Sequence, residues 1–266
     1  FSGHCSPWFF IYATVAVLEL TEIRKDAGFT FPEKLVDQSS PTAQHHNALL
    51  RGLTHKLNNL LAVIQGFSSL VLMQDGLDEM SQENLKHMKD AAGSASDLGE
   101  QILPAGGCSR VDLAELKLAE FVPMLINRLR SQAEKSSIPF ESNVGQDLPV
   151  ILTDQGKLRM ILDRLVTNAV EAVGTRGDIA VDVLAPGQVP GSKSDCVDVF
   201  VRNTGSEIPE EKLLEIFQPF YTTKDSTHLG IGLSTAYVLA GQLDMDLGVR
   251  SVEGTTTFWL RLKVAS

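Results

Sequence analysis

Large apolar residues recur along residues 50–71 at alternating intervals of three and four positions. They are Leu50, Leu53, Leu57, Leu60, Ile64, Phe67 and Val71. This spacing is typical of the seam of a helix that packs against other helices. With Leu50 at heptad position a, His55 falls at f and Asn59 at c, both away from the seam. The pattern predicts a long helix with one buried stripe and an outward-facing imidazole beside an amide.

We expect this helix to span residues 42–75 and to end near Gly76, because glycine is a natural helix stop. A second helix should follow a short connection over residues 77–81. Its apolar stripe comprises Leu85, Met88, Ala92, Ala95, Leu98 and Ile102, and the segment 104–107, which contains proline and glycine, ends it. Two such helices form an antiparallel hairpin, which alone buries little surface. We therefore expect two copies to pair as a homodimer with a four-helix bundle.

The pattern changes after residue 110, where helical and strand-like segments alternate. Helices are expected over residues 111–130, 154–173 and 234–242. Strands are expected over residues 138–144, 179–184, 197–202, 247–251 and 256–264, with the last two closing a hairpin. Helices interspersed with hairpin-type strands predict an α+β sandwich, in which helices cover one sheet. The predicted fold is thus α+β, a helical hairpin followed by a sandwich.

The amino-terminal residues show a different apolar pattern. The apolar run over residues 8–20 is shorter than the roughly 20 residues that span a bilayer, and its β-branched and aromatic residues favour a buried strand. Together with residues 19–25 it resembles the last strand of a PAS sensor domain entering its signalling helix. Residues 1–26 would then be a sensor remnant and residues 27–41 a linker. The cytoplasmic end of a cut transmembrane helix is the alternative.

Composition narrows the possible partners. The 266 residues carry a net charge of −10, which argues against a general nucleic-acid-binding surface. Cys5, Cys108 and Cys196 are widely separated and lack metal-ligand spacing, so we expect reduced thiols in a cytoplasmic protein. We expect no membrane contact by this region.

Residues 55–61, HKLNNLL, resemble the H box of two-component sensor histidine kinases, which has the pattern H-D/E-x-N-N-x-L. Taken alone, an exposed histidine on a helix is most often merely solvated. The resemblance implies that His55 is the phosphorylated residue. It also implies that Asn59 positions the water that dephosphorylates a partner receiver domain.

Five further segments resemble, in family order, the boxes of the histidine kinase ATP-binding domain. They are residues 165–172 (N box), 203–209 (G1), 216–224 (F), 230–234 (G2) and 254–256 (last box). The resemblance implies that the chain binds ATP and that the amide oxygen of Asn168 ligates Mg²⁺. The glycines at the start of a helix could turn their backbone N–H groups toward phosphate. The implied nucleotide-binding positions are Asn168, Asn203, Gly205, Lys224, Gly230, Gly232 and Gly254.

Several reactive positions depart from the family pattern: Lys56, Arg164, Asn203, Glu207 and His228. Lys56 stands where the family has an acidic residue that accepts the proton of the histidine, and a protonated lysine only donates. Arg164 replaces an Asn or Glu, and the neighbouring Asp163 cannot substitute, because five residues turn a helix about 140° away from that face. Asn203 replaces the adenine-binding Asp and lacks its charge. Glu207 adds bulk and charge near a polyphosphate.

The resemblance therefore implies the cytoplasmic catalytic core of a sensor histidine kinase. Residues 42–109 would form the dimerisation and phosphotransfer domain, and residues 110–266 the ATP-binding domain. Mg-ATP would phosphorylate His55, which would pass the phosphoryl group to a response-regulator receiver domain. The departures favour an alternative, a degenerate pseudokinase that acts as an ATP-independent phosphotransferase or receiver phosphatase. A purely structural interaction module is the third possibility.

Overall fold

The computed structural model describes residues 29–30, 41–74, 76–105, 107, 109–173, 177–188, 195–205, 207–223 and 230–264. The expected sensor remnant over residues 1–26 lies outside the described residues, as do Lys224 and His228. Within the described part of the chain, no helix is both long enough and apolar enough to cross a membrane.

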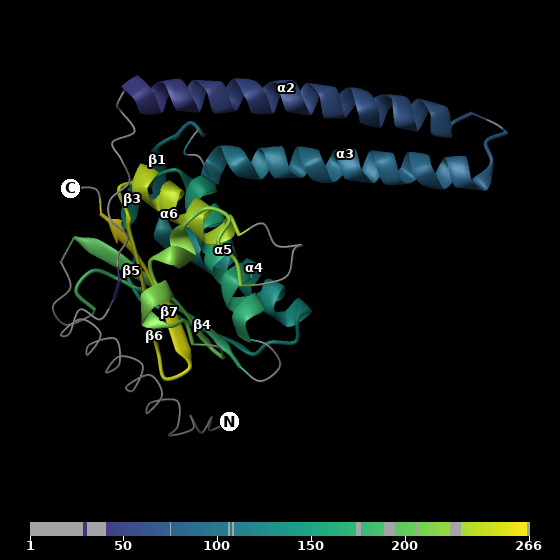
Figure 1. Ribbon diagram of the computed structural model, residues 1–266. Helices are drawn as coiled ribbons and strands as arrows, with labels where there is room; N and C mark the ends of the chain where they lie inside the picture. Colours follow the sequence, from purple (N-terminus) through teal and green to yellow (C-terminus); the bar gives the residue numbers. More distant parts are fainter. Residues whose placement is uncertain are drawn as a thin grey trace.

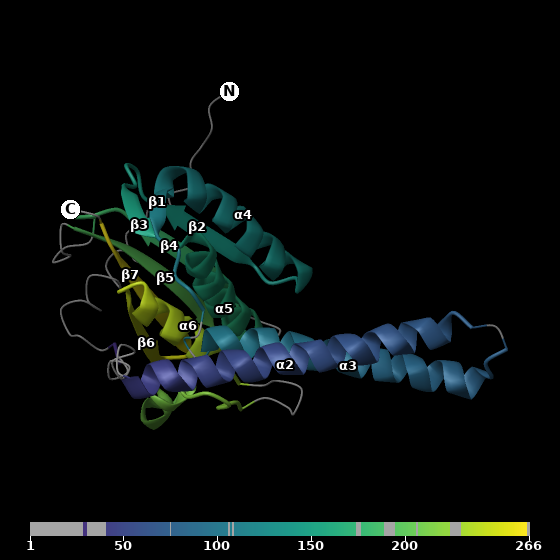
Figure 2. The same ribbon diagram turned by 90° about the horizontal axis from the view of Figure 1, so that it is seen from above.

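The predicted helical hairpin is present. Helix α2 (Pro41–Leu72) and helix α3 (Glu79–Ala105) run side by side and project from the rest of the molecule (Figures 1 and 2). Asp78 caps the second helix, because its carboxylate accepts hydrogen bonds from the Ser81 backbone N–H (2.8 Å) and hydroxyl (2.7 Å). These two bonds hold the pKa of Asp78 below its usual value. The observed boundaries lie within a few residues of those expected from the apolar pattern.

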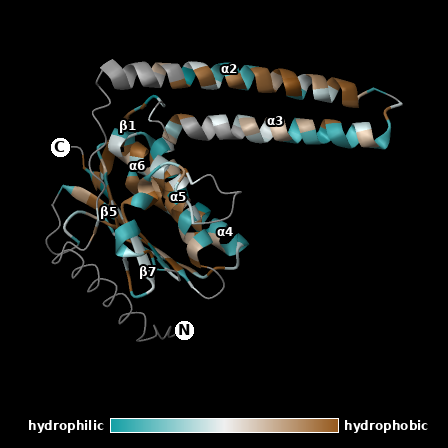
Figure 3. Ribbon diagram, viewed as in Figure 1, coloured by the Kyte–Doolittle hydropathy of each residue, from teal (hydrophilic) through white to brown (hydrophobic). Residues whose placement is uncertain are grey.

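The contact between the two helices does not use the predicted apolar stripe. Leu53, Leu60 and Phe67 are 66%, 64% and 65% exposed in the single chain. Instead, α2 presents a smaller and more polar row to α3, in which Thr54, Leu61 and Ser68 are buried. Figure 3 shows the apolar colouring of α2 gathered in its carboxyl-terminal half. One chain therefore leaves this stripe uncovered.

Small residues on α3 decide which face of α2 is buried. Ala92 and Gly99 are buried against α2. A Cβ atom on Gly99 would lie 2.9 Å from Asn58 Oδ1 and 3.3 Å from Thr54 Cγ2. The absence of that Cβ lets the two backbones approach closely at this level, one turn from His55.

The remaining chain forms a five-stranded sheet with the order β2-β4-β5-β7-β6. Its strands are β2 (Phe140–Val144), β4 (Ile179–Leu184), β5 (Cys196–Thr204), β6 (Asp246–Val252) and β7 (Thr255–Lys263). Strand β2 pairs in parallel with β4, and the other pairs are antiparallel, so the predicted β6–β7 hairpin is confirmed. Helices α4 (Leu118–Lys135), α5 (Gln155–Val173) and α6 (Gly232–Gln242) cover one face of the sheet (Figure 2). The predicted α+β sandwich is correct.

The prediction of one helix over residues 111–130 is wrong at its start. Residues Ala114–Lys117 form strand β1, which pairs with strand β3 (Val150–Thr153) in a separate two-stranded sheet. The sequence AELK has good helical propensity, but the distant β3, which the apolar pattern did not reveal, provides a hydrogen-bonding edge for it. Asp154 Oδ2 also accepts the backbone N–H of Asp112 (3.0 Å), which holds the entry to β1 in place.

The main core lies between the helices and the sheet. Fully buried residues come from both layers and include Ile161, Leu165, Ala169, Val201, Leu239, Phe258 and Leu260. On the other face of the sheet, Phe29 packs against Leu184, Phe200 and Trp259. Next to it, Thr30 exchanges two backbone hydrogen bonds with Val249 on the β6 edge. The chain before α2 is thereby attached to the sheet.

Two side chains hold the connection between the hairpin and the sandwich. Buried Lys157 on α5 donates hydrogen bonds to Ser109 and, at 3.2 Å, to Gln242 Oε1. Gln242, at the end of α6, donates in turn to the Gly107 carbonyl at 2.6 Å. Burial lowers the pKa of Lys157, and nearby Asp154 opposes that effect. This arrangement anchors the end of α3 to α5 and α6, the helices that border the pocket described below.

A buried carboxyl on β4 predicts a specific pH dependence of stability. Burial raises the pKa of Asp182, Arg202 opposes the shift, and Glu141 adds to it. An acid whose pKa is higher in the folded state costs stability as pH rises above its unfolded value near 4, because the unfolded chain releases the proton first. We expect Asp182→Asn to raise the free energy of unfolding at pH 8 by on the order of 1 kcal/mol, with no gain at pH 3.

Urea unfolding at the two pH values measures this difference. Asp112→Asn is the matched control, since Asp112 is exposed and the chemical change is identical. A lower stability of Asp182→Asn at pH 8 would mean that the attraction of Arg202 outweighs the cost of burial.

Candidate functional site

A cavity of about 760 Å³ opens beside α5, the amino terminus of α6 and the chain that follows β5. This volume is in the range of small-molecule and cofactor pockets. Four of the predicted nucleotide-binding residues line it: Asn168, Asn203, Gly230 and Gly232. Gly205 and Gly254 are not among its lining residues, and a 2.9 Å backbone hydrogen bond from the Gly205 N–H to the Gly254 carbonyl joins them. The structure thus brings together residues that are far apart in the sequence.

Asn203 is the most informative residue of the cavity. It is 1% exposed, and neither its Oδ1 nor its Nδ2 has a hydrogen-bond partner among the described residues. Thr256, 2% exposed, lies directly opposite it on β7 and also lines the cavity. A buried amide without partners costs free energy, so such groups are rare unless a ligand completes them. This position fits the hydrogen-bonding edge of a bound base.

Helix α5 contributes one face of the cavity. Arg164, Asn168 and Glu171 recur at helical spacing and all line it. The predicted metal ligand Asn168 therefore lies beside a cation at Arg164. No group of three or more His, Cys, Asp or Glu side chains suited to a metal ion occurs in the described part of the chain. A cation held here would depend on Asn168 together with oxygens of a ligand or water, as Mg²⁺ beside phosphates commonly does.

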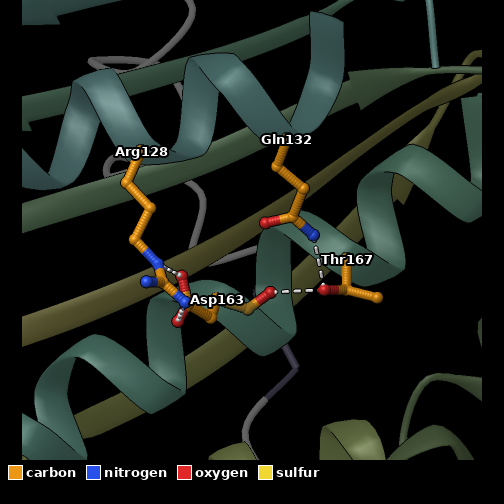
Figure 4. A network of polar contacts seen from close by, with 4 residues as sticks. All are labelled: Arg128, Gln132, Asp163 and Thr167. Carbon is orange, nitrogen blue, oxygen red and sulfur yellow. Dashed lines mark hydrogen bonds and ion pairs between the residues drawn. The ribbon is translucent and has the colours of Figure 1, made fainter. Parts of the chain in front are cut away.

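Asp163 points away from the cavity, as its position on the helix predicts. Figure 4 shows its carboxylate on Arg128 of α4, with Oδ2 3.0 Å from Nη2 and Oδ1 3.1 Å from Nε. In the same network, the Thr167 hydroxyl donates to the Asp163 carbonyl (2.8 Å) and accepts from Gln132 Nε2 (2.7 Å). These contacts connect α5 to α4. Arg164, rather than Asp163, therefore lines the cavity at the position where the family has Asn or Glu.

The glycines have different structural roles. Gly230 has a φ of +65°, and a Cβ atom on it would lie 2.5 Å from the Tyr221 carbonyl oxygen. Gly205 has a φ of +148°, and its Cβ would lie 2.9 Å from the Ala172 carbonyl oxygen. Gly232 starts α6 with open space around its Cβ position. Gly230 and Gly205 are therefore required by the backbone itself, whereas Gly232 is not.

Glu207 lines the cavity, but its carboxylate is already engaged. Its Oε2 accepts the Gly254 backbone N–H at 3.0 Å, which joins the segment after β5 to the β6–β7 turn. Sequence reasoning did not single out Thr256 or Lys212, which also line the cavity. Thr256 could have been found, since it belongs to the last predicted box. Lys212 carried no motif, and its 2.7 Å ion pair with Glu215 raises its pKa.

His55 and Asn59 lie on α2, apart from the cavity-lining elements. Both side chains are exposed, and the Asn59 Nδ2 lies 3.4 Å from the His55 Nδ1. This contact orients the imidazole ring. The amide nitrogen can only donate, so Nδ1 accepts in this contact and a neutral ring carries its proton on Nε2. Lys56 is exposed as well, next to the histidine.

Residues 153–266 match the family model described as histidine kinase-, DNA gyrase B- and HSP90-like ATPase. Over these residues the chain is thus similar to an ATP-binding domain found in histidine kinases. Every residue that lines the cavity lies within the matched segment. Together with the relatives below, this match confirms the predicted resemblance to two-component histidine kinases.

Curated relatives extend the similarity beyond the ATPase domain. The chain is 26% identical over 216 residues to the sensor histidine kinase ZraS of Salmonella typhimurium, covering 80% of this chain and 45% of ZraS. It is 29% identical over 231 residues to the aerobic respiration control sensor protein ArcB of Escherichia coli, covering 80% of this chain and 28% of ArcB. The chain spans less than half the length of these relatives.

Two solved structures share the fold of the histidine kinase-type ATPase domain together with the helices before it. The crystal structure of full-length ShkA in complex with AMPPNP has a TM-score of 0.66 at 22% identity, covering 82% of this chain and 46% of ShkA. The structure of histidine kinase ThkA in complex with response regulator protein TrrA has a TM-score of 0.53 at 22% identity, covering 82% and 61%. The similarity thus includes the order of hairpin and sandwich.

Proposed function

We propose that this chain is the cytoplasmic catalytic core of a sensor histidine kinase, which phosphorylates itself on His55 from Mg-ATP. The phosphoryl group then passes to an aspartate of a response-regulator receiver domain. The observation that carries this proposal is the Asn203 amide, which is buried at the cavity wall and whose two polar atoms have no partner among the described residues. The ATPase domain family and the relatives among sensor kinases support it.

Each part of the site has a distinct task in this reaction. Asn203 and Thr256 hold the base, and the start of α6 presents backbone N–H groups to the phosphates. Mg²⁺ held through Asn168 would neutralise phosphate charge. A nitrogen of His55 attacks the γ-phosphorus, so that an N–P bond forms while the bond to the bridging oxygen breaks and ADP leaves with the electron pair. The ring proton passes to water, because protonated Lys56 has no lone pair to accept it.

We also propose that two copies pair through α2, with residues 42–109 as the dimerisation and phosphotransfer domain. The exposed stripe on α2, which includes Leu53, Leu60 and Phe67, is too apolar for a stable free surface. A second copy of the same hairpin offers a matching stripe. Residues 110–266 would then be the nucleotide-binding domain.

Calorimetric titration of Mg-ATP into the chain tests the nucleotide site. We expect saturable binding, weakened roughly tenfold or more by Asn168→Ala, because the amide oxygen would be lost as a metal ligand. Binding that persists unchanged in Asn168→Ala contradicts the role of that residue. The absence of any binding at millimolar nucleotide contradicts the kinase proposal.

One set of observations favours a second function, a pseudokinase that dephosphorylates or exchanges phosphoryl groups with a receiver domain. Arg164 lies in the cavity wall next to Asn168, and Lys56 adjoins His55. Both place positive charge at positions where the family has Asn or an acidic residue. The exposed pair of His55 and Asn59 is nevertheless intact, and it suits chemistry on a phosphorylated partner that needs no ATP.

A further inference from the structure

We propose that Asn203 opens the base subsite to 6-oxopurine nucleotides, such as GTP and ITP, in addition to ATP. This inference rests on the proposed function, because it requires the cavity to be a nucleotide site. It goes further by naming the substrate class and the residue that sets it.

The position of Asn203 is rigid. It lies on β5 between two strands, opposite Ile179 on β4 and Thr256 on β7. Of the polar residues that line the described cavity, only Asn203 and Thr256 are buried. The backbone pairing on both sides keeps the amide at the cavity wall, so a ligand must meet it there.

Neighbouring polar groups do not occupy the amide. The hydroxyls of Thr256 and Ser251 are 2.8 Å apart and bond each other, and Ser251 Oγ also accepts the Ile208 backbone N–H at 2.9 Å. The carboxylate of Glu207 is engaged by the Gly254 N–H. Neither polar atom of Asn203 has a partner among the described residues, and a base edge supplies what is missing.

The chemistry of the amide differs from that of the carboxylate it replaces. An ionised carboxylate only accepts, so it bonds the 6-amino group of adenine and repels the 6-oxo group of guanine or hypoxanthine. An amide offers a donor beside an acceptor. Against adenine, Oδ1 accepts from the 6-amino group while Nδ2 donates to N1.

Rotation of the terminal torsion by half a turn exchanges Oδ1 and Nδ2. Nδ2 then donates to the 6-oxo group while Oδ1 accepts from N1–H. Both purine classes can therefore satisfy the same buried side chain. Sites with a fixed hydrogen-bond pattern reject the mismatched analogue strongly, because a buried polar group is left unpaired. With asparagine at position 203, neither purine class leaves this buried side chain unpaired, so neither class is rejected for that reason.

Calorimetric titrations of the whole chain with Mg-ATP, Mg-GTP and Mg-ITP test the proposal. For the wild type we expect dissociation constants within about tenfold of one another. Asn203→Asp should keep ATP binding and weaken GTP and ITP by roughly 100-fold or more, which reflects the unpaired and repelled 6-oxo group. Asn143→Asp is the matched control, because Asn143 is exposed on β2 and does not line the cavity. Its ratios should equal those of the wild type.

The outcomes separate this inference from the proposed function. Wild-type binding of ATP with GTP and ITP at least 100-fold weaker overturns the inference and leaves the nucleotide site standing. Binding of ATP by Asn203→Asp alone also overturns it, because the asparagine would then block nucleotides rather than broaden their range. No binding of any nucleotide by either protein, with circular dichroism showing both folded, overturns the inference and the nucleotide site together.

Discussion

Replacing His55 with glutamine is expected to abolish the phosphoryl label that the chain acquires from γ-labelled ATP, a loss of roughly 100-fold or more. Glutamine keeps a polar side chain of similar length on α2, but its amide nitrogen has no nucleophilic lone pair. Because His55 is exposed, the substitution removes no buried contact and the hairpin should remain folded. Acid-labile label on the chain, measured after gel separation, is the readout.

Asn59→Ala separates the two proposed functions. Asn59 lies 3.4 Å from the imidazole, so its loss frees the ring but leaves the nucleophile in place. We expect this variant to keep label from ATP and to lose receiver-dependent dephosphorylation. Equal labelling of His55→Gln and the wild type would exclude His55 as the phosphorylated residue. A wild type that takes no label from ATP, yet removes it from a phosphorylated receiver, would establish the pseudokinase.

The second large effect is expected at Gly230. Alanine there would need a φ of +65° and would bring Cβ within 2.5 Å of the Tyr221 carbonyl oxygen and 2.7 Å of the Phe220 carbonyl carbon. Left-handed backbone alone costs an ordinary residue roughly 1–2 kcal/mol, and a clash with backbone atoms cannot be relieved by rotating a side chain. The start of α6 must therefore shift, and we expect Gly230→Ala to lower nucleotide affinity at least 100-fold, about 2.7 kcal/mol.

Gly232→Ala is the matched control for this effect. It makes the same chemical change two residues later, where no described atom lies within 4 Å of the Cβ position. We expect wild-type thermal stability and a much smaller change in affinity. If both variants lose nucleotide equally, close approach of the ligand rather than backbone strain explains the glycines. If neither does, the start of α6 is not part of the nucleotide site.

Much of the fold could be predicted from apolar spacing because it is a local signal. The periodicity of three and four residues marked both helices of the hairpin, and the valine-rich strands β4 and β5 were located within a few residues. Strand β1 was missed because its pairing with β3 is not local. The four residues of β1 have good helical propensity, and nothing in their sequence indicates that they pair with the edge of β3, which lies more than thirty residues away.

The sequence by itself determined the order of most elements, the resemblance to histidine kinase ATP-binding domains and four of the residues that line the cavity. These follow from local patterns and short motifs, which can be recognised in the sequence without knowledge of any tertiary contact. The tertiary structure alone decided which of these residues act together. It turned the polar row of α2 toward α3, because Gly99 allows close approach there, and it left the apolar stripe exposed.

The tertiary structure also distinguished residues that the motifs treated alike. Gly230 and Gly232 belong to one motif, but only Gly230 is forced by its φ and its surroundings. Glu207 and Asn203 both depart from one box, yet Glu207 accepts a backbone N–H, whereas Asn203 at the cavity wall has no partner within the part of the chain that the structure describes. Burial and hydrogen bonding depend on what the folded chain brings near each residue, and no spacing along a sequence contains that information.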